Sequence, residues 1–441
     1  MDTNPKTVPR VPRFRCLTLA WWLVACCGFS GCSAPQDSGT PEKKAAEPVD
    51  LRLTIVDDPD LVRVVGRLRA EWKARSGGTL EVDSMTVQDL RAAKSLGGDA
   101  AIYPSPELGL LAERGLITPV PQTVLEHSDL AWPEVFELLR TAECRWGQAT
   151  YAIPLGSPAL TCLYRTDLFE KLNRPPPRTW EQYQQLVEFF ANRENLADAV
   201  SADVPWFPTL EPLAAGWSGK LLLARAAAYA KHRDNYSALF NIETMEPLVA
   251  TEPFVRALEE LVAAAKNTPP ERSALDPAGV LREFLSGHSA LALTWPVGPL
   301  AGKNLPLPSV KAGLGFVELP GSPMVFDQSG KKWRRREADE NQYVTLLGID
   351  GRLGSVSAAS SHSLQAFELL VWLASETWSM RVSAASPHTT LYRVTQMGKP
   401  EAWVPPGTPL TAARQYARSV QQAMSGPACL YTVRLPAGRN T

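Results

Sequence analysis

The stretch YAIPLGSPALTCLYRTDLFEKLNRPPPRTWEQY, Tyr151 to Tyr183, decides the fold of this 441-residue chain. It begins with two strand-like runs, YAIPL and ALTCLY, which Gly156, Ser157 and Pro158 separate. Glycine and proline interrupt strands because the first has no side chain to pack and the second has no amide hydrogen to donate. The break therefore predicts that the chain bends between residues 155 and 161 and passes from one sheet into another.

Two helix starts follow this bend. In DLFE (Asp167–Glu170) and in TWEQ (Thr179–Gln182), a capping residue is followed three places later by Glu or Gln. In such a pair the two side chains accept hydrogen bonds from free amides of the first helical turn. The prolines at 175–177 lie between the two patterns and cannot continue the first helix. The sequence therefore predicts two helices separated by a proline-rich turn.

Before the stretch, strand-like and helix-like segments alternate. LRLTIV (Leu51–Val56) is a β-branched run, and LVRVVGRLRAEWKARSGG after it places Leu61, Val64, Val65, Leu68 and Trp72 at helical spacing before a double glycine. TLEVDSM then alternates as a strand, VQDLRAAKSLGG is typical of a helix, and DAAIY of a buried strand. Such alternation predicts an α/β fold with a parallel sheet and helices on its faces.

Further segments of the same kind come after the stretch. LREFLSGHSALALTWPVG is typical of a helix that ends at Gly287, followed by a buried strand that ends at Trp295. SLQAFELLVWLAS (Ser363–Ser375) is apolar on nearly every face and predicts a buried helix. The chain is longer than one core usually serves, so we expect two domains.

Taken in order, these segments resemble the family 1 extracellular solute-binding proteins of ABC importers, the group that includes maltodextrin-binding proteins. The resemblance runs from Leu51 to about Tyr392. It implies a two-lobe periplasmic-binding-protein fold (type II), α/β in both lobes, with hinge-joined lobes and a ligand cleft between them. The segments that carry it are GGDAAIYPSPELGLLAERGLITPV, YAIP, TDLFEK, PPPRTW, FNIETMEPLVATEPFVRALEEL, FLSGHSALALTWP, FVELPG and SAASSHSLQAFELLVWLAS.

The same resemblance implies how the lobes and the function are organised. Lobe 1 would comprise residues 51–157 plus 341–395, and lobe 2 residues 158–340 plus 396–441. The chain would capture a small solute, favoured to be a sugar or oligosaccharide, and deliver it to ABC permease subunits in the membrane. We expect a monomer that uses no cofactor, no metal and no catalytic residue.

Seven residues are candidate ligand contacts. An aromatic ring can stack on the apolar face of a sugar, and a carboxylate can accept hydrogen bonds from paired hydroxyls. Each candidate has a structural alternative: the aromatic residues can belong to a core, and Asp57 or Asp58 can cap the helix that follows. Ser157, at the crossing, stands where some sugar binders carry an acidic residue. The candidates are Asp57, Asp58, Tyr103, Ser157, Trp206, Trp217 and Trp295.

The N-terminus is typical of an exported lipoprotein. Basic residues up to Arg15 precede the uncharged run CLTLAWWLVACCGFS, which is shorter than the roughly 20 residues that a membrane-spanning helix needs. FSGC ends at Cys32 and resembles a lipobox, so residues 1–31 are predicted as a signal peptide, Cys32 as the lipidation site and residues 32–50 as a flexible tether. LVAC, which ends at Cys26, is an alternative lipobox, and cleavage without lipidation is a second alternative. We expect the protein outside the cytoplasm, anchored to a bacterial membrane on its periplasmic side.

Charge and cysteine content exclude several classes of protein. Lys plus Arg number 45 and Asp plus Glu 46, a balance that argues against a nucleic-acid partner. The basic run KKWRRRE (Lys331–Glu337) is typical of a solvated loop or hairpin tip, with a polyanion site as the alternative. No CxxC spacing is present, so zinc-ribbon and thioredoxin sites are not expected. Cys144, Cys162 and Cys429 are interpreted first as small buried residues, with a Cys144–Cys162 disulfide as the alternative.

Two rival functions remain. An anchored carbohydrate hydrolase would need a carboxylate pair that only the folded structure can reveal, although GxSxG and HExxH motifs are absent. A lipoprotein that senses a ligand for a membrane receptor would need the same closing cleft as an importer component.

Overall fold

The computed structural model describes residues 48–235, 237–266, 274–295 and 313–432. The chain divides into two units, Met1–Ala46 and Glu47–Thr441, and the described residues belong to the second. The predicted signal peptide and both candidate lipidation cysteines, Cys26 and Cys32, lie outside the described residues. Within the described part, no helix has the length and apolar character needed to cross a membrane.

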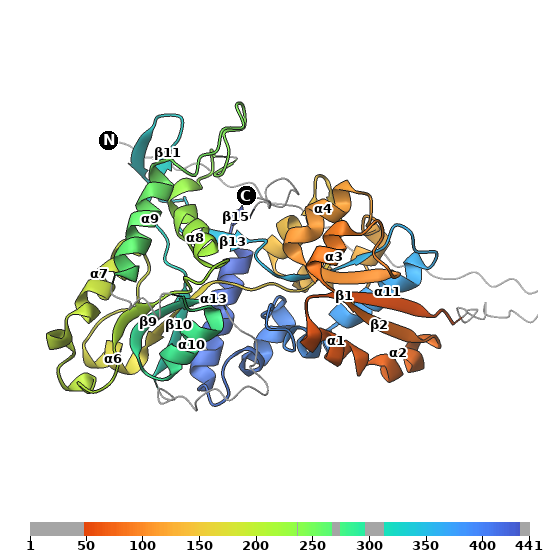
Figure 1. Ribbon diagram of the computed structural model, residues 1–441, viewed down its shortest axis with the longest axis horizontal. Coiled ribbons are helices and arrows are strands. Elements are labelled where there is room, and N and C mark those ends of the chain that lie inside the picture. The colour runs from red at the N-terminus through yellow and green to blue at the C-terminus, as the bar shows by residue number, and fades with distance from the viewer. Residues whose placement is uncertain (1–47, 236, 267–273, 296–312, 433–441) are drawn as a thin grey trace, which may run out of the picture. The chain divides into compact units, whose positions relative to one another are not determined.

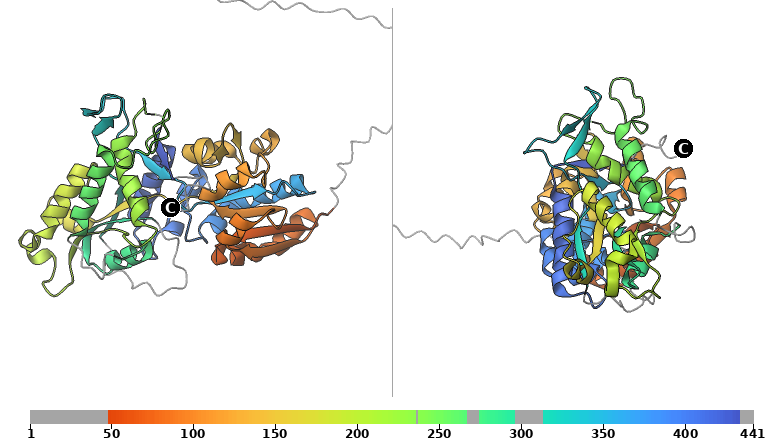
Figure 2. Two further views of the ribbon diagram at one scale, coloured as in Figure 1. Left: turned by 45° about the horizontal axis from the view of Figure 1, so that its top comes forward. Right: turned by 90° about the vertical axis from the view of Figure 1, so that its left-hand side faces the viewer.

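The first sheet carries five strands in the order β2-β1-β3-β14-β6 among the described residues (Figure 1). The first three strands are parallel, as the alternation of strands and helices predicted, whereas β14 runs antiparallel to both of its neighbours. Figure 2 shows the light-blue β14 among the red and orange strands, so a late segment completes a sheet that the N-terminal region begins. The strands are β1 (Leu51–Val56), β2 (Leu80–Met85), β3 (Ala100–Pro104), β6 (Ile153–Gly156) and β14 (Arg352–Val356).

The second sheet has the order β10-β7-β9-β8 among the described residues. β7 is antiparallel to both β9 and β10, and β8 is parallel to β9. Short two-stranded pairs accompany the two sheets. The strands of the second sheet are β7 (Thr161–Arg165), β8 (Phe207–Leu210), β9 (Ser289–Thr294) and β10 (Leu314–Glu318), and the short pairs are β4 (Arg145–Trp146) with β5 (Ala149–Thr150), β11 (Met324–Asp327) with β12 (Lys332–Arg335), and β13 (Thr345–Leu347) with β15 (Cys429–Tyr431).

Helices surround both sheets, which confirms the α/β prediction (Figure 1). We call the first sheet with its helices the first lobe, and the second sheet with its helices the second lobe. The helices of the first lobe are α1 (Pro59–Gly66), α2 (Arg69–Ser76), α3 (Val87–Ala92), α4 (Leu108–Glu113), α5 (Gln122–Leu125), α11 (Ser363–Ala374) and α12 (Glu376–Ser383); those of the second are α6 (Thr166–Lys171), α7 (Trp180–Ala191), α8 (Ser218–Ala230), α9 (Glu252–Ala265), α10 (Pro277–Leu285) and α13 (Leu410–Ser425).

Both faces of each sheet are buried. Along β3, Ile102 belongs to one hydrophobic cluster and Tyr103 to the cluster on the opposite face. Along β7, Cys162 and Leu163 are divided between two clusters in the same way. Successive side chains of a strand point to opposite faces, so apolar residues at consecutive positions require cover on both sides. This explains why the strands appear in the sequence as short continuous apolar runs.

The chain leaves the first sheet at Gly156 and enters the second at Thr161, which is where the sequence predicted a crossing. Gly156 has φ of 131°, a backbone conformation that residues with a side chain rarely adopt. A Cβ atom at this position would lie 2.5 Å from Cβ of Thr389. The crossing therefore requires glycine for its backbone and for its close packing.

Gly156→Ala is expected to lower the free energy of unfolding by about 1–3 kcal/mol, because the new Cβ adds both backbone strain and overpacking. Thermal melting and denaturant titration measure the change. The matched control is Gly66→Ala at the end of α1, where a Cβ meets nothing within 4 Å. That variant should be neutral or slightly stabilised. Equal stabilities of the two variants would contradict the assigned role of Gly156.

Several local predictions can be compared with the structure. Thr179 caps α7 by accepting from the amide of Gln182, as TWEQ predicted. The prediction for DLFE is wrong: α6 begins at Thr166, so Asp167 lies within its first turn and not at the cap position, and its carboxylate accepts from the guanidinium of Arg165. The single helix predicted after β1 is divided into α1 and α2 at Arg67 and Leu68, directly after Gly66.

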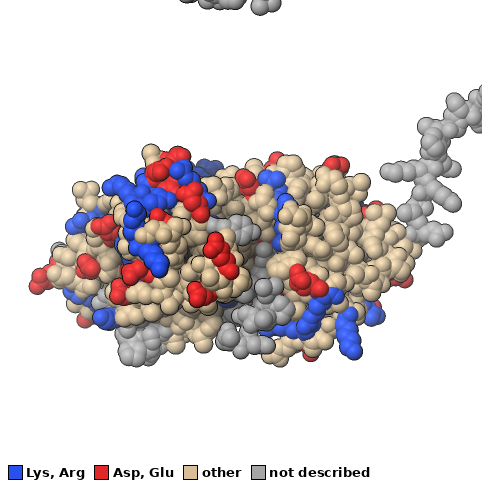
Figure 3. Space-filling view, turned by 90° about the horizontal axis from the view of Figure 1, so that it is seen from above, with Lys and Arg blue, Asp and Glu red and all other residues tan. Residues whose placement is uncertain are grey.

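The cysteine and charge predictions can also be compared. Cys144 and Cys162 are buried and no disulfide joins them, so that alternative is wrong, and Cys429 is half-buried. The basic run forms strand β12 of a hairpin, in which Arg334 pairs with Glu340. On the face seen in Figure 3, basic and acidic side chains are interspersed and do not form a field of one sign.

Candidate ligand-binding site

A cavity of about 470 Å³ lies where strands of the first sheet end. β1 and β3 reach it with their carboxyl ends and β14 with its start, while α8 of the second lobe contributes Lys220. The carboxyl ends of parallel strands are where open α/β sheets place ligands, and the volume is within the range of small-molecule sites. We call this cavity the cleft site. Its lining is Asp57, Val87, Arg91, Pro104, Pro106, Glu107, Lys220, Gly348, Ile349, Asp350, Arg352, His388 and Thr432.

The buried side chain of Arg352 holds three aspartates at the cleft site in place. Its side chain is 1% exposed, and its Nε donates to Oδ2 of Asp58 at 2.9 Å. Its Nη1 donates to the carbonyl and carboxylate of Asp350, and its Nη2 to the carbonyl of Asp57. One guanidinium thus ties the end of β1 to the start of β14. Because Nε, Nη1 and Nη2 all donate to protein atoms, we assign Arg352 the role of positioning other residues of the site.

The two neighbouring aspartates have different roles. Asp58 is buried; its Oδ1 accepts from the amide of Leu61 and its Oδ2 from Arg352 and from the hydroxyl of Ser386. The helix-capping alternative is therefore confirmed for Asp58. Asp57 is exposed and lines the cavity, and its Oδ2 accepts from the amide of Val87 at 3.0 Å. Its second oxygen, Oδ1, has no partner among the described residues and can accept from a ligand.

Asp350 and His388 form a pair on the same wall. Nδ1 of His388 lies 2.5 Å from Oδ2 of Asp350. Burial alone would raise the pKa of Asp350, but the hydrogen bond from His388 and the charge of Arg352 hold the pKa below its ordinary value. Asp350 is thereby held as a carboxylate that orients the imidazole. The other ring nitrogen of His388 has no partner among the residues described and lies on a side chain that lines the cavity.

Arg91 and Glu107 make a second ion pair at the cavity. Nε and Nη2 of Arg91 donate to the two carboxylate oxygens of Glu107 at 3.2 and 2.8 Å. The Glu107 side chain is 2% exposed, and that of Arg91 is 43% exposed. Such a two-pronged pair fixes the plane of the guanidinium and leaves its outer edge facing the cavity.

Lys220 is the contribution of the second lobe. It lies in the first turn of α8, and its Nζ is 4.3 Å from the centre of the Trp217 ring. Burial lowers the pKa of Lys220, an effect that the charge of Asp350 partly offsets. No hydrogen-bond acceptor for Nζ is found among the described residues, so the ammonium group can donate to a ligand.

The predicted tryptophans Trp217 and Trp295 lie together behind Lys220. Their ring centres are 5.2 Å apart, and Trp295 is 1% exposed. Trp217 is half-buried and packs on the second-lobe core. The structure thus brings these two candidates together and connects them to the cleft site through the Lys220–Trp217 contact. Neither lines the cavity in this conformation.

The remaining candidates are packed within the lobes. Tyr103 is fully buried and its hydroxyl is 2.6 Å from Oγ of Ser355. Ser157 is 2% exposed and donates to Oε1 of Glu143 at 3.0 Å. Trp206 packs against the second-lobe core and donates to the carbonyl of Phe190. Of the seven candidates, Asp57 lines the cavity directly, and ligand contact by all seven stays a prediction.

Sequence reasoning missed most of the residues that line the cleft site. Arg91 and Glu107 follow strands β2 and β3, so a systematic search of strand ends could have found them. Lys220 and His388 carry no such signal, because their approach to Asp57 depends on the packing of distant segments. A metal-binding role has no support: among the described residues, no group of His, Cys, Asp and Glu could hold a metal ion.

Comparisons with known proteins address the fold. No protein-family model matches the chain, and no curated protein matches its sequence. Among solved structures, an ABC transporter solute-binding protein from Agrobacterium radiobacter K84 in complex with ribitol has a TM-score of 0.61 at 17% identity, over 86% of this chain and 88% of that one. The sugar-binding protein MalE from Xanthomonas citri has a TM-score of 0.63 at 15% identity, over 89% of both chains.

A third structure, maltose-bound MalE3 from T. maritima, has a TM-score of 0.59 at 17% identity, over 87% of this chain and 90% of that one. The similarity thus extends over nearly all of the described residues and of each neighbour. The chain has the two-lobe fold of MalE-like ABC solute-binding proteins, as the sequence resemblance implied.

Proposed function

We propose that this chain is an extracytoplasmic solute-binding protein that captures a sugar or polyol in the cleft site and delivers it to the permease subunits of an ABC importer. The observation that carries the proposal is that the arginines at the strand ends are paired with carboxylates of the protein. Arg352 and Arg91 are committed to the carboxylates of Asp58, Asp350 and Glu107, so the fixed charge of the cavity is largely balanced.

The hydrogen-bonding groups of the cavity that have no partner in the described part of the chain suit a neutral ligand rich in hydroxyls. Oδ1 of Asp57 can accept a hydrogen bond, and Nζ of Lys220 and the outer edge of Arg91 can donate one. A sugar or polyol carries donors and acceptors on adjacent carbons and can satisfy both kinds of group. A cation would be repelled by Lys220 and an anion by Asp57, both of which line the cavity.

Two finer points belong to the same proposal. Solved structures with this fold include solute-binding proteins in complex with ribitol or with maltose, which supports capture of a solute over hydrolysis. The N-terminal run ending in FSGC supports export and lipid attachment at Cys32, which would keep the protein at the outer face of the membrane. Approach of the second lobe, which carries Lys220, to the first would enclose the solute.

Lys220→Ala and Asp57→Asn are each expected to weaken binding of the solute about 10- to 100-fold, because each removes a charge-assisted hydrogen bond. Isothermal titration calorimetry with ribitol, mannitol, maltose and an amino-acid panel measures the affinity of the purified protein. Lys94→Ala, which removes an exposed lysine of the first lobe outside the cavity, is the matched control and should bind as the unmodified protein does.

Three results would count against the proposal. If a sugar binds and neither substitution weakens it, the cleft site is not where it binds. If the sugar is consumed during the titration, the hydrolase alternative replaces binding. If only amino acids bind, the solute class is wrong although the site survives.

A further inference from the structure

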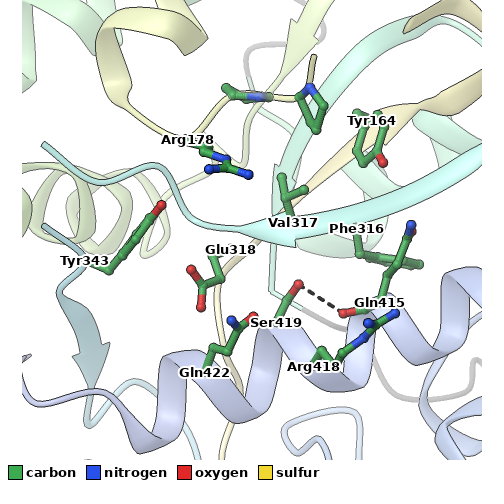
Figure 4. Close-up of a pocket in the computed structure, with 12 residues that line it drawn as sticks. Tyr164, Arg178, Phe316, Val317, Glu318, Tyr343, Gln415, Arg418, Ser419 and Gln422 are labelled. Carbon is green, nitrogen blue, oxygen red and sulfur yellow. Dashed lines mark hydrogen bonds between the residues drawn. The ribbon is translucent and has the colours of Figure 1, made fainter. Parts of the chain in front are cut away.

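A second and larger groove, of about 600 Å³, lies on the second lobe (Figure 4). Its walls are the edge strand β10 and helix α13, and the turn before α7 closes one end. It shares no lining residue with the cleft site. We call it the β10–α13 groove. A ligand in this groove would therefore contact none of the residues that line the cleft site.

Glu318 is the unusual group in this groove. Its side chain projects from the end of β10, and no hydrogen bond or ion pair to it is found among the described residues. Burial raises its pKa, and no neighbouring positive charge offsets that effect. The other shielded glutamates of the second lobe are each compensated: Glu211 by Arg225, Glu260 by Arg256, and Glu340 by Arg334. A partly buried carboxylate without a donor costs stability, and a ligand that supplies donors would satisfy it.

The surroundings of Glu318 combine aromatic and planar polar side chains. Tyr343 is half-buried and lies beside Glu318 in Figure 4, with Gln422 on the facing turn of α13. Phe316 and Tyr164 form an apolar floor and are 6% and 9% exposed. Aromatic carbon next to carboxylate and amide groups matches a molecule that has an apolar C–H face and a rim of hydroxyls.

Two exposed arginines restrict the class of ligand further. Arg178 and Arg418 line the groove, and the only hydrogen bond of the Arg418 guanidinium among the described residues is to the carbonyl of Arg414. A simple cation would be repelled by these two guanidinium groups. A simple anion would meet the uncompensated carboxylate of Glu318. A neutral ligand with many hydroxyls can accept from the arginines and donate to Glu318.

We propose that the β10–α13 groove is a second carbohydrate-binding site, in which one sugar unit packs on Tyr343 and donates hydroxyl hydrogens to Glu318. The site holds a saccharide on the outside of the second lobe and leaves the cleft site free. The protein therefore binds carbohydrate at two independent places.

The test is binding of soluble oligosaccharides to the full purified protein, with a glycan array to find ligands and saturation-transfer NMR to measure them. Glu318→Gln and Tyr343→Ala should each weaken the groove ligand at least tenfold and leave the cleft ligand unchanged. Lys220→Ala should do the reverse. Glu259→Gln, an exposed glutamate of α9 outside both sites, is the matched control and should change neither affinity.

A stability measurement separates a binding role from a structural one. If Glu318 serves a ligand, Glu318→Gln relieves an uncompensated charge and the melting temperature stays the same or rises. A fall in melting temperature together with lost binding would mean that Glu318 supports the fold, and the proposal would fail. Gln422→Trp, which fills the groove from an exposed position on its rim, should abolish groove binding without unfolding the protein.

Other outcomes overturn the proposal directly. The groove is not a carbohydrate site if every sugar that binds is lost in Lys220→Ala and kept in Glu318→Gln, Tyr343→Ala and Gln422→Trp. It is a site of a different class if polyamines or inorganic phosphate, included as probes, bind there and sugars do not.

Discussion

Arg352→Ala is expected to lower the free energy of unfolding by about 3–5 kcal/mol and to abolish measurable solute binding. The loss is large because the substitution leaves the carboxylate of Asp58, whose side chain is fully buried, without its ion pair. It also removes the donor to the carbonyl of Asp57, so the loop that carries this cleft residue loses its anchor. Denaturant titration measures the stability, and calorimetry with the sugar panel measures the binding.

The matched control is Arg63→Ala, which breaks an exposed pair between Arg63 and Asp60 on α1. Exposed pairs are worth about 0–1 kcal/mol, so this variant should retain nearly full stability. The double variant Arg352→Met with Asp58→Ser keeps a capping hydroxyl but no buried charge, and it should recover part of the lost stability. If Arg352→Ala is as stable as the control, Arg352 does not tie β1 to β14.

Glu211→Ala should have an effect of similar size in the second lobe, about 3–5 kcal/mol, because it removes the hydrogen-bonded partner of the buried Arg225 and leaves only the longer contact of Nη1 with Oε2 of Glu260, at 3.9 Å. The side chains of Arg225 and Glu211 are 1% and 3% exposed, and Nη2 lies 2.8 Å from Oε2. Tyr183 also donates to Glu211, at 2.9 Å, and Trp180 packs on the guanidinium with its ring centre 4.2 Å from Cζ. The substitution thus disturbs a hydrogen-bonded network as well as an ion pair.

Here the control is Glu81→Ala, which breaks a pair with Arg52 whose two side chains are more than half exposed. Circular dichroism during denaturation measures both variants, and the control should change stability by less than about 1 kcal/mol. Because Glu211 lies outside the cleft site and the β10–α13 groove, Glu211→Ala should keep its solute affinity under conditions in which it stays folded. A stable Glu211→Ala variant would mean that Arg225 finds another acceptor.

The order of strands and helices could be predicted from the sequence because local patterns determine it. Thr179 and Asp58 could be predicted as caps, since a cap depends on residues only a few places away. Asp167 shows the limit of such patterns: the helix begins one residue before it, at Thr166, so Asp167 is not at the cap position and pairs with Arg165 instead. The antiparallel insertion of β14 depends on contacts across some two hundred residues of chain, and no short pattern encodes it.

The cleft site was harder to predict from the sequence than the fold. Asp57 could be found because it follows a parallel strand directly. Tyr103 was placed by the same rule, but its ring points to a face of the sheet that α4 and its neighbours cover, and it is fully buried. Lys220, Asp350 and His388 meet only after both lobes have formed, so their convergence is a property of tertiary structure. The aromatic residues expected around a sugar are found behind Lys220 and in the β10–α13 groove instead.

The position of β14 inside the first sheet has a consequence for a chain that is still being made. β14 fills the place between β3 and β6, and it enters the sequence only at Arg352. Until then β3 and β6 each present an open hydrogen-bonding edge, the kind of surface from which aggregation begins. The first lobe, although encoded first, is completed late, and nascent or truncated chains that stop short of this strand leave those edges exposed.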